Sequence, residues 1–434
     1  MTIKKRAIGG VKWTTFATVG LAIVSIIKLS VLTRFLEKAD FGLMALVAFV
    51  LGFIGLFMDM GLTSAILHKQ YITKDQYASL YWINILFSIL LYAIIISISS
   101  LISSFYEELE LKKILIIMGI SLIFSAIGQQ FKTIEQKELN FKFISIVDIS
   151  SGILSLGLAI ILAINNAGVY ALVYSALFQF LTSNISFFVF GIRKHGLRLH
   201  FKYNETKSYL KIGIYQVGGQ IINYFNRDLD ALIIGKFFGT DILGGYSLAK
   251  QLVFRPASII NPILTKVAAP TLAMYQDNIT SLRLNYLKLV NILATLNFIM
   301  YFAIIILARP MVNILYGGGF EHIVILVRIL SIYMFLRSIG NPVGSLVIAT
   351  GRTDLEFKWN IISFFAIPAA VIIGSQFSIE WVALAITIAM LILQIPFWRF
   401  LIYIMLGIGI KEYFINFIPK MDLINYVRRN AFKS

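Results

Sequence analysis

Apolar runs long enough to cross a bilayer recur along the whole chain, and they constrain its fold more than any other feature. A membrane-spanning helix needs about 20 mostly apolar residues, and the 434 residues hold about twelve such runs. Charged residues make up only 14% of the chain, against about 25% in soluble proteins. We therefore expect an all-α, polytopic membrane protein with about 12 transmembrane helices and both ends in the cytoplasm.

The expected spans are separated by short connectors that are charged or rich in glycine and asparagine. In chain order they lie near residues 13–35, 40–66, 78–104, 112–131, 143–165, 168–192, 210–236, 242–269, 285–308, 322–350, 357–375 and 379–407. The basic start of the chain leads into an apolar run too long for a signal peptide, so we expect a retained first span.

The distribution of lysine and arginine fixes the expected orientation. With the N-terminus inside, 25 cations fall in cytoplasmic segments or at their span ends, and six fall in outer segments. Cytoplasmic loops of membrane proteins carry such an excess. This bias accounts for most of the net charge of +17, so we expect contact with anionic membrane lipids and no nucleic-acid partner.

The chain reads as two halves of six spans. A shift of 202 residues aligns Arg34-Phe35 with Lys236-Phe237, and Gly42 with Gly244. An even number of spans per half predicts parallel repeats, with a substrate site between two lobes. We expect a six-helix lobe over 1–200, a second over 201–410 and a basic cytoplasmic tail over 411–434. All eight prolines fall in the second half. The five that lie within predicted spans predict helix kinks, either fixed or acting as hinges: Pro256, Pro262, Pro342, Pro368 and Pro396.

Seven cations remain inside the predicted spans after the topology count. An intramembrane charge is costly and usually faces the protein interior, a partner or water. Arg399 lies near the inner end of its span and is expected to snorkel to the interface. The other six are the candidate substrate-binding residues of a cationic cavity: Lys28, Arg227, Lys250, Arg255, Arg328 and Arg337.

Two readings of these cations stay open. Arg227 and Asp230 stand at i,i+3 and are placed to pair on one helix face, as are Gln251 and Arg255 at i,i+4. Arg328 and Arg337 fall on opposite faces of an ideal helix unless the Gly340/Pro342 region distorts it. The charges therefore form internal salt bridges, or they line a cavity for an anionic ligand such as a phosphate or diphosphate.

Intramembrane acids are fewer than the cations, which favours an anionic ligand. They are Asp59, Asp148, Asp228 and Asp230. Asp148 lies near the start of its span, where a helix N-terminal role and an ionic role are both open. Asp148, Asp228 and Asp230 are candidates for coupling transport to H⁺ or Na⁺, with the membrane potential as the alternative driving force.

Motifs for catalysis and cofactors are missing from the sequence. There is no cysteine, and the four histidines lack metal-ligand spacing. The glycines at 317–319 lack the Gly-Lys-Ser/Thr ending of a P-loop. We therefore expect no enzyme, no cofactor and no metal site. A multidrug/cation antiporter is the main alternative to a carrier of anions. An antiporter would need acidic residues in the first lobe to bind cationic drugs and ions, and span one, which carries Lys28 and no acid, argues against it. A membrane glycan ligase or polymerase is disfavoured because every outer connector is short.

Several stretches together resemble a known family. They are TRFLEKADFGLM at 33–44, FMDMGLTSAI at 57–66, NRDLDALIIGKFFG at 226–239, LGGY at 243–246 and LYGGGF at 315–320. Their order and spacing resemble Wzx-type O-antigen and capsule flippases, in particular the branch similar to the colanic acid exporter. That family belongs to the multidrug/oligosaccharidyl-lipid/polysaccharide (MOP) superfamily.

This resemblance implies a MATE-like fold and a flippase in the bacterial inner membrane. Such a protein moves undecaprenyl-diphosphate-linked oligosaccharide units to the periplasmic leaflet by alternating access. The family's cation-lined cavity maps by position onto Arg227, Lys250, Arg255, Arg328 and Arg337. Other polysaccharide-assembly proteins are further candidate partners.

Overall fold

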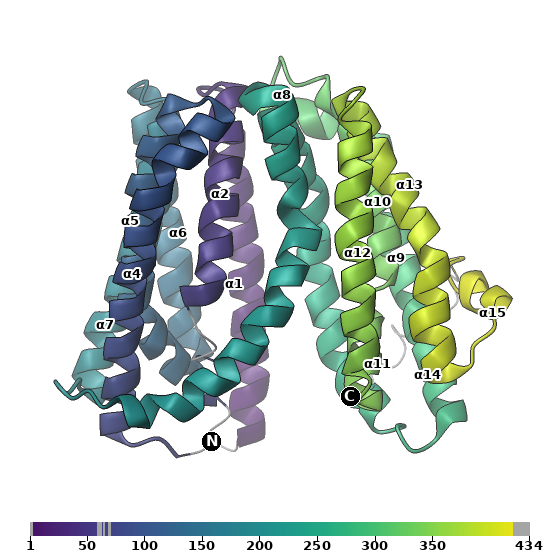
Figure 1. Ribbon diagram of the computed structural model, residues 1–434, viewed down its shortest axis with the longest axis horizontal. Helices are drawn as coiled ribbons and strands as arrows, with labels where there is room; N and C mark the ends of the chain where they lie inside the picture. Colours follow the sequence, from purple (N-terminus) through teal and green to yellow (C-terminus); the bar gives the residue numbers. More distant parts are fainter. Residues whose placement is uncertain (1–2, 59–62, 64–65, 68–70, 420–434) are drawn as a thin grey trace. The chain divides into compact units, whose positions relative to one another are not determined.

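The computed structural model describes residues 3–58, 63, 66–67 and 71–419 (Figure 1). These residues form helices and connectors, and no strand occurs among them. The part of the predicted tail from residue 420 onward lies outside the described residues. The helices, in chain order, are α1 (Ile3–Leu32), α2 (Lys38–Met58), α4 (Lys74–Tyr106), α5 (Leu109–Lys137), α6 (Phe141–Ile164), α7 (Val169–His195), α8 (Tyr203–Ala273), α9 (Ile279–Tyr316), α10 (Ile323–Ile339), α11 (Pro342–Thr350), α12 (Thr353–Gly374), α13 (Ile379–Phe397), η1 (Trp398–Tyr403), α14 (Ile404–Leu406) and α15 (Ile410–Ile415).

Ten helical segments in the described part of the chain are long and apolar enough to cross a membrane. The all-α, multi-pass architecture expected from the apolar runs is thereby confirmed. The seventh and eighth predicted spans both fall within α8, which is 71 residues long. The count of twelve spans therefore stays a prediction.

A glycine divides α8 into two helices. Gly239 has φ 78° and ψ −179°, a backbone conformation that only glycine adopts without strain. The break falls between the predicted spans 210–236 and 242–269, where an outer turn was expected. The helix distortion considered for the Gly340/Pro342 region is also present, because α10 ends at Ile339 and α11 begins at Pro342. Helix α9 continues through Pro310 to Tyr316, beyond the predicted end of its span at residue 308.

The described chain divides into two compact units. The first runs to Gly244 and includes Leu315–Gly317; the second holds Gly245–Ile314 and the residues from Gly318 onward. The first unit thus contains the first part of α8 as well as α1 to α7. The lobe boundary predicted at residue 200 stays a prediction.

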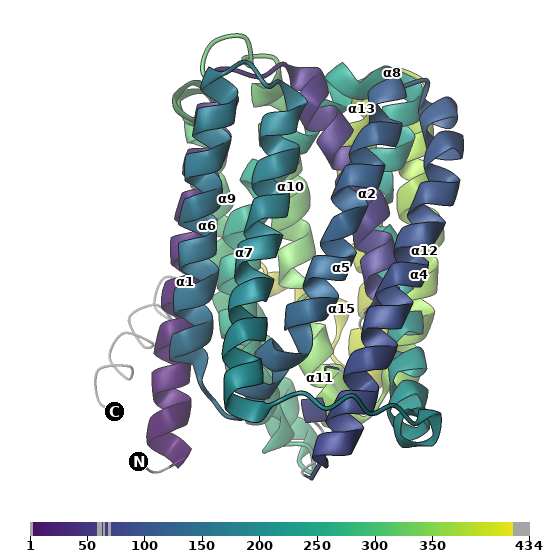
Figure 2. The ribbon, with the colours of Figure 1, turned by 90° about the vertical axis from the view of Figure 1, so that its left-hand side faces the viewer.

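In the first unit, α7 packs against both α5 and α6, α4 packs against α5, and α1 packs against α6. Figure 2 shows α6, α7, α5 and α4 running beside one another. Aromatic and aliphatic side chains from α4, α5, α6 and α7, including Tyr81, Phe131, Val147 and Phe187, form one buried cluster. This packing holds α7 between α5 and α6.

Local sequence explains where α4 begins. Thr73 and Gln76 form a capping box, in which the Thr73 hydroxyl accepts from the Gln76 backbone N–H and the Gln76 side chain accepts from the Thr73 backbone N–H. The two bonds satisfy donors that an uncapped helix start leaves open.

The connector between α7 and α8 spans only residues 196–202, shorter than the predicted 193–209, and it is tied to α4. Trp82 Nε1 donates to the Arg198 carbonyl over 3.0 Å, and Ser79 Oγ donates to Glu205 over 2.7 Å. The hydrogen bond from Ser79 holds the pKa of Glu205 below its usual value. These contacts fix the start of α8 within the first unit.

Two glycines allow a close backbone crossing within the first unit. A Cβ atom at Gly42 of α2 would overlap the carbonyl oxygen of Thr240, and one at Gly244 would overlap the carbonyl oxygen of Lys38. The contact is reciprocal under the 202-residue shift, since Lys38 corresponds to Thr240 and Gly42 to Gly244. The weak sequence repeat therefore has a structural counterpart.

In the second unit, α13 packs against both α10 and α12 (Figure 1). Its buried core includes Tyr286, Leu346, Leu401 and Tyr413. Pro396, near the end of α13, is followed at once by the π-helical turn η1. Proline cannot donate to the helix ladder, so a local change of helix type at this point is expected.

Candidate functional site

The predicted cations divide between the two units. Lys28 and Arg227 lie in the first, on α1 and α8. Lys250 and Arg255, on the second part of α8, and Arg328 and Arg337, on α10, lie in the second. The surroundings of each cation determine what it is able to bind, so the units are described in turn.

In the second unit, Lys250 and Arg337 meet at one aromatic ring. Lys250 Nζ lies 5.3 Å from the centroid of Phe254, and Arg337 Cζ lies 6.0 Å from the same centroid. The Phe254 ring stacks on Tyr333 at 6.2 Å, and Arg337 Nη1 donates to the Tyr333 hydroxyl over 2.7 Å. We call these four residues the aromatic-cation cluster. Ring faces attract cations, so the cluster holds two half-buried positive charges near one point.

The other two cations of this unit behave differently. Arg255 Nη2 donates to Gln251 Oε1 over 3.4 Å, as the i,i+4 spacing predicts. Arg328 is exposed, and its Nε donates to the Ile305 carbonyl of α9 over 3.4 Å. The break between α10 and α11 follows both arginines, so it does not bring Arg328 to the face of Arg337. Arg328 is therefore the one of the two arginines that makes its contacts elsewhere, at the Ile305 carbonyl.

In the first unit, Arg227 makes an ion pair on its own helix. Its Nε lies 2.7 Å from Asp228 Oδ2, whereas the expected partner was Asp230. The Asp230 carboxylate accepts from the Ala231 backbone N–H over 2.9 Å. The Arg227 guanidinium also lies 5.6 Å from the Tyr224 ring, whose hydroxyl donates to the Phe49 carbonyl of α2.

Lys28 is held by hydroxyl groups. Its Nζ donates to Ser155 Oγ over 3.0 Å, and Ser155 Oγ donates to the Ser175 carbonyl over 2.6 Å. No salt bridge to Lys28 occurs among the residues that the structure describes. Lys28 is therefore a half-buried cation with a polar but uncharged neighbour.

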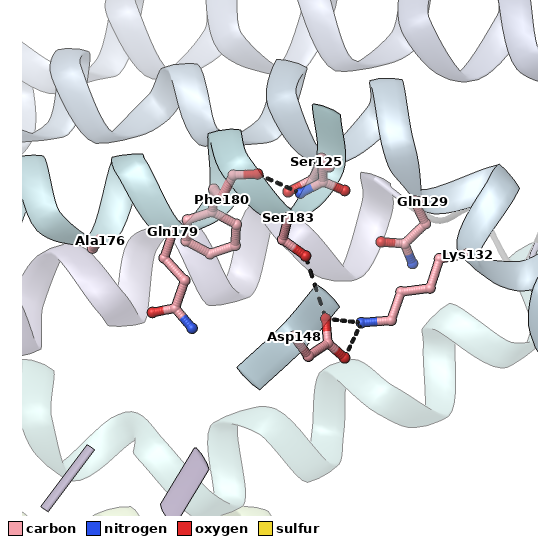
Figure 3. Close-up of a pocket in the computed structure, with 9 residues that line it drawn as sticks. Ser125, Gln129, Lys132, Asp148, Ala176, Gln179, Phe180 and Ser183 are labelled. Carbon is pink, nitrogen blue, oxygen red and sulfur yellow. Dashed lines mark hydrogen bonds and ion pairs between the residues drawn. The ribbon is translucent and has the colours of Figure 1, made fainter. Parts of the chain in front are cut away.

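Asp148 lies in a polar pocket that no motif in the sequence indicates (Figure 3). Lys132 Nζ donates to both oxygens of Asp148, over 2.9 and 2.8 Å, and Ser183 Oγ donates to Asp148 over 3.3 Å. The pocket has a volume of about 310 Å³ and is lined by Ser125, Gln129, Lys132, Asp148, Ala176, Gln179, Phe180, Ser183 and Asn184. We call it the amide pocket.

The structure decides between the two roles left open for Asp148. Helix α6 begins at Phe141, so Asp148 lies about two turns inside the helix and cannot cap its N-terminus. The ionic role, with Lys132 as partner, is the observed one. In the sequence, Lys132 lies next to the predicted end of its span at residue 131, where it is one of the 25 cations assigned to the cytoplasmic side. The fourth intramembrane acid, Asp59, lies outside the described residues.

One histidine does meet acids in space, despite the lack of metal-ligand spacing in sequence. Ligand atoms of Glu135, Glu138 and His195 all lie within 4.8 Å of one another. However, Lys194 Nζ already bridges the two carboxylates, at 2.8 Å from Glu135 and 2.5 Å from Glu138. The ammonium supplies the charge that a metal ion would supply, so the group is best described as an ion-pair network.

Comparison with known proteins places the chain in a family. Residues 31–325 match the family described as polysaccharide biosynthesis protein. The chain belongs to this family. The resemblance to Wzx-type proteins of polysaccharide biosynthesis, predicted from the motifs above, is thereby confirmed.

Individual relatives match the chain along most of its length. It is 27% identical over 399 residues to the lipopolysaccharide biosynthesis protein WzxC of Escherichia coli K12, covering 91% of this chain and 80% of WzxC. It is 28% identical over 417 residues to the teichuronic acid biosynthesis protein TuaB of Bacillus subtilis, covering 95% of this chain and 86% of TuaB.

Solved structures show the same fold. The lipid II flippase MurJ, in an inward closed conformation, superposes with a TM-score of 0.76 at 14% identity, covering 95% of this chain and 90% of MurJ. An inward-facing multidrug resistance transporter of the MATE family superposes with a TM-score of 0.69 at 13% identity, covering 87% and 93% of the two chains. The MATE-like fold that the resemblance implied is confirmed.

Proposed function

We propose that this family member is a flippase for undecaprenyl-diphosphate-linked oligosaccharide. It moves these units from the cytoplasmic to the periplasmic leaflet of the bacterial inner membrane, for O-antigen, capsule or exopolysaccharide assembly. Membership of a polysaccharide biosynthesis family supports a glycan as cargo, and the names of WzxC and TuaB support a surface polysaccharide as its destination.

The aromatic-cation cluster carries the proposal. Lys250 and Arg337 hold two positive charges at the Phe254 ring, in a part of the chain expected to lie in the membrane. Guanidinium donors match the oxygens of a phosphate in bidentate geometry, and an ammonium adds a point charge. A diphosphate headgroup supplies two adjacent anionic groups, which suits a pair of cations. Arg255, on the turn of α8 that follows Lys250, adds a third cation in the same unit.

The driving force belongs to the same proposal, and its three candidates are an H⁺ gradient, a Na⁺ gradient and the membrane potential. Coupling to H⁺ or Na⁺ would use an acid, for which Asp148, Asp228 and Asp230 are available. The membrane potential would act directly on the cations. The first two acids already have basic partners, Lys132 and Arg227. Transport assays in vesicles, with each gradient imposed alone, distinguish the three candidates.

Substitutions in the cluster test the function. In a strain that depends on this protein for its surface polysaccharide, Arg337→Ala and Lys250→Ala are each expected to reduce export at least about tenfold, because each removes a charge-assisted contact to the diphosphate. Surface polysaccharide is measured by immunoblot, and protein in the membrane fraction is measured in parallel.

Arg399→Ala is the matched control. Arg399 is an exposed arginine of the second unit whose guanidinium lies over its own helix neighbour Tyr403, so its loss is expected to leave export unchanged. Normal surface polysaccharide in both cluster variants would contradict the proposed function. Loss of drug resistance with unchanged polysaccharide would favour the multidrug antiporter instead.

A further inference from the structure

The amide pocket is a built cavity within the first unit. Its lining comes from α5, α6 and α7, and α7 packs against both of the other helices. At about 310 Å³ it falls in the range of small-molecule pockets, roughly 300–1,000 Å³. Bare polar groups facing lipid are costly, so a pocket with this lining is filled by water or by a polar ligand.

The charges in the pocket cancel. Both oxygens of Asp148 accept from Lys132 Nζ, so the pair presents a dipole with no net charge. An anion such as a diphosphate meets the carboxylate as well as the ammonium, and a sodium ion meets the ammonium. Electrostatics therefore disfavours both kinds of ion and favours a neutral polar ligand.

Two carboxamides leave hydrogen-bonding capacity for that ligand. Gln129 on α5 and Gln179 on α7 are half-buried, and neither side chain has a hydrogen-bond partner among the residues that the structure describes. Figure 3 shows them on either side of Asp148. Each amide offers two donors and an acceptor oxygen, which is the set needed to bind neighbouring hydroxyl groups. Phe180 adds an apolar ring surface that is 41% exposed.

We propose that the amide pocket binds a neutral sugar residue of the transported glycan. This inference rests on the proposed function, because that function supplies the glycan. The pocket contributes recognition of the sugar through Gln129, Gln179 and the oxygens of Asp148, separately from recognition of the diphosphate. It is thus a specificity site.

Paired lipid probes test the inference on the purified full chain. Native mass spectrometry compares binding of undecaprenyl diphosphate with binding of undecaprenyl diphosphate carrying a single glucose, galactose or N-acetylglucosamine. The wild-type chain is expected to bind at least one sugar-bearing lipid about fivefold or more tightly than the bare lipid, as one or two added hydrogen bonds give. In Gln129→Met/Gln179→Met this preference is expected to disappear while binding of the bare lipid stays unchanged.

The methionine variant preserves side-chain length and packing, and its retained binding of the bare lipid shows that it is folded. Asn165→Ala is the matched control, since this exposed amide at the end of α6 bonds only its own helix, at the Ile161 carbonyl. It is expected to keep the preference. Equal binding of all the lipids by the wild type, or a preference that survives in the methionine variant, overturns the sugar site and leaves the proposed function standing. Failure of the wild type to bind any of the lipids overturns both.

Discussion

At the scale of single residues, the pair formed by Lys132 and Asp148 shows what a sequence predicts about a charged side chain and what it does not. The sequence places both residues near the cytoplasmic ends of their spans. It does not show that they meet, because they lie on different helices and their contact depends on how α5, α6 and α7 pack. The side chains are only 31% and 21% exposed, so each depends on the other for neutralisation.

Breaking this pair is expected to destabilise the protein. Lys132→Ala leaves the Asp148 carboxylate partly buried without its cation, and we expect a loss of roughly 1–3 kcal/mol, visible as a lower midpoint of thermal unfolding in detergent. The charge swap Lys132→Asp/Asp148→Lys is expected to recover most of that loss. Lys113→Ala is the control on the same helix, because Lys113 is 63% exposed in its pair with Glu110 and such surface pairs contribute about 0–1 kcal/mol. Equal midpoints for the Lys132 and Lys113 variants would show that the Asp148 pair has no stabilising role.

Among the candidate binding residues, too, the sequence predicts some and not others. The cation surplus inside the spans predicts that some arginines and lysines gather, and Lys250 and Arg337 do so around Phe254. That Arg328 lies apart follows from the helical spacing, since nine residues reverse the face of an ideal helix. The two glutamines of the amide pocket carry no charge and follow no motif, so no pattern in one sequence singles them out.

At the scale of helices, most elements follow directly from the apolar periodicity and from the breakers within it. The positions of Gly239 and of Gly340/Pro342 mark real interruptions. Pro310 does not interrupt α9, which shows that a proline within a helix is accommodated where its surroundings allow. The reciprocal crossing of α2 with residues 240–244 of α8 could not be predicted from the sequence. The contact joins backbone atoms, and its only requirement on the sequence is a glycine at each of the two positions.

This crossing predicts an unequal response to two alanines on one helix. Gly42→Ala places a methyl group against the Thr240 carbonyl oxygen, so the backbones must separate, and we expect a clear fall in folded yield and thermal midpoint. Gly55→Ala, also on α2, meets nothing within 4 Å and is expected to be neutral or slightly stabilising, as alanine is a better helix former than glycine. Fluorescence-detected size-exclusion chromatography over a temperature series compares the two. A Gly42 variant as stable as the Gly55 variant would remove the case for close packing here.

At the scale of the whole molecule, composition alone predicts a multi-pass helical membrane protein, and the helices and the family confirm it. The cytoplasmic termini stay a prediction from the bias of 25 cations to six, and the inner-membrane location stays a proposal that follows from the family resemblance. The glycan itself leaves no such signature, because neutral sugars are recognised by hydrogen bonds rather than by charge.

The orientation is open to direct measurement, because the chain contains no cysteine. Leu109, 85% exposed at the start of α5, is predicted to face the periplasm, and Leu199, 93% exposed between α7 and α8, is predicted to face the cytoplasm. In spheroplasts, a membrane-impermeant maleimide is expected to label Leu109→Cys directly and Leu199→Cys only after permeabilisation. The opposite labelling pattern would invert the topology, and the cysteine-free parent controls for background.

The Lys132 and Asp148 pair also bears on how the protein enters the membrane during synthesis. The two residues are separated by 16 positions, and only residues 138–140 lie between α5 and α6. At translation speeds of about 5–20 residues per second, they leave the ribosome within roughly 1–3 s of each other. We therefore expect α5 and α6 to reach the lipid as a hairpin whose acid and base are already matched, before α7 has left the ribosome.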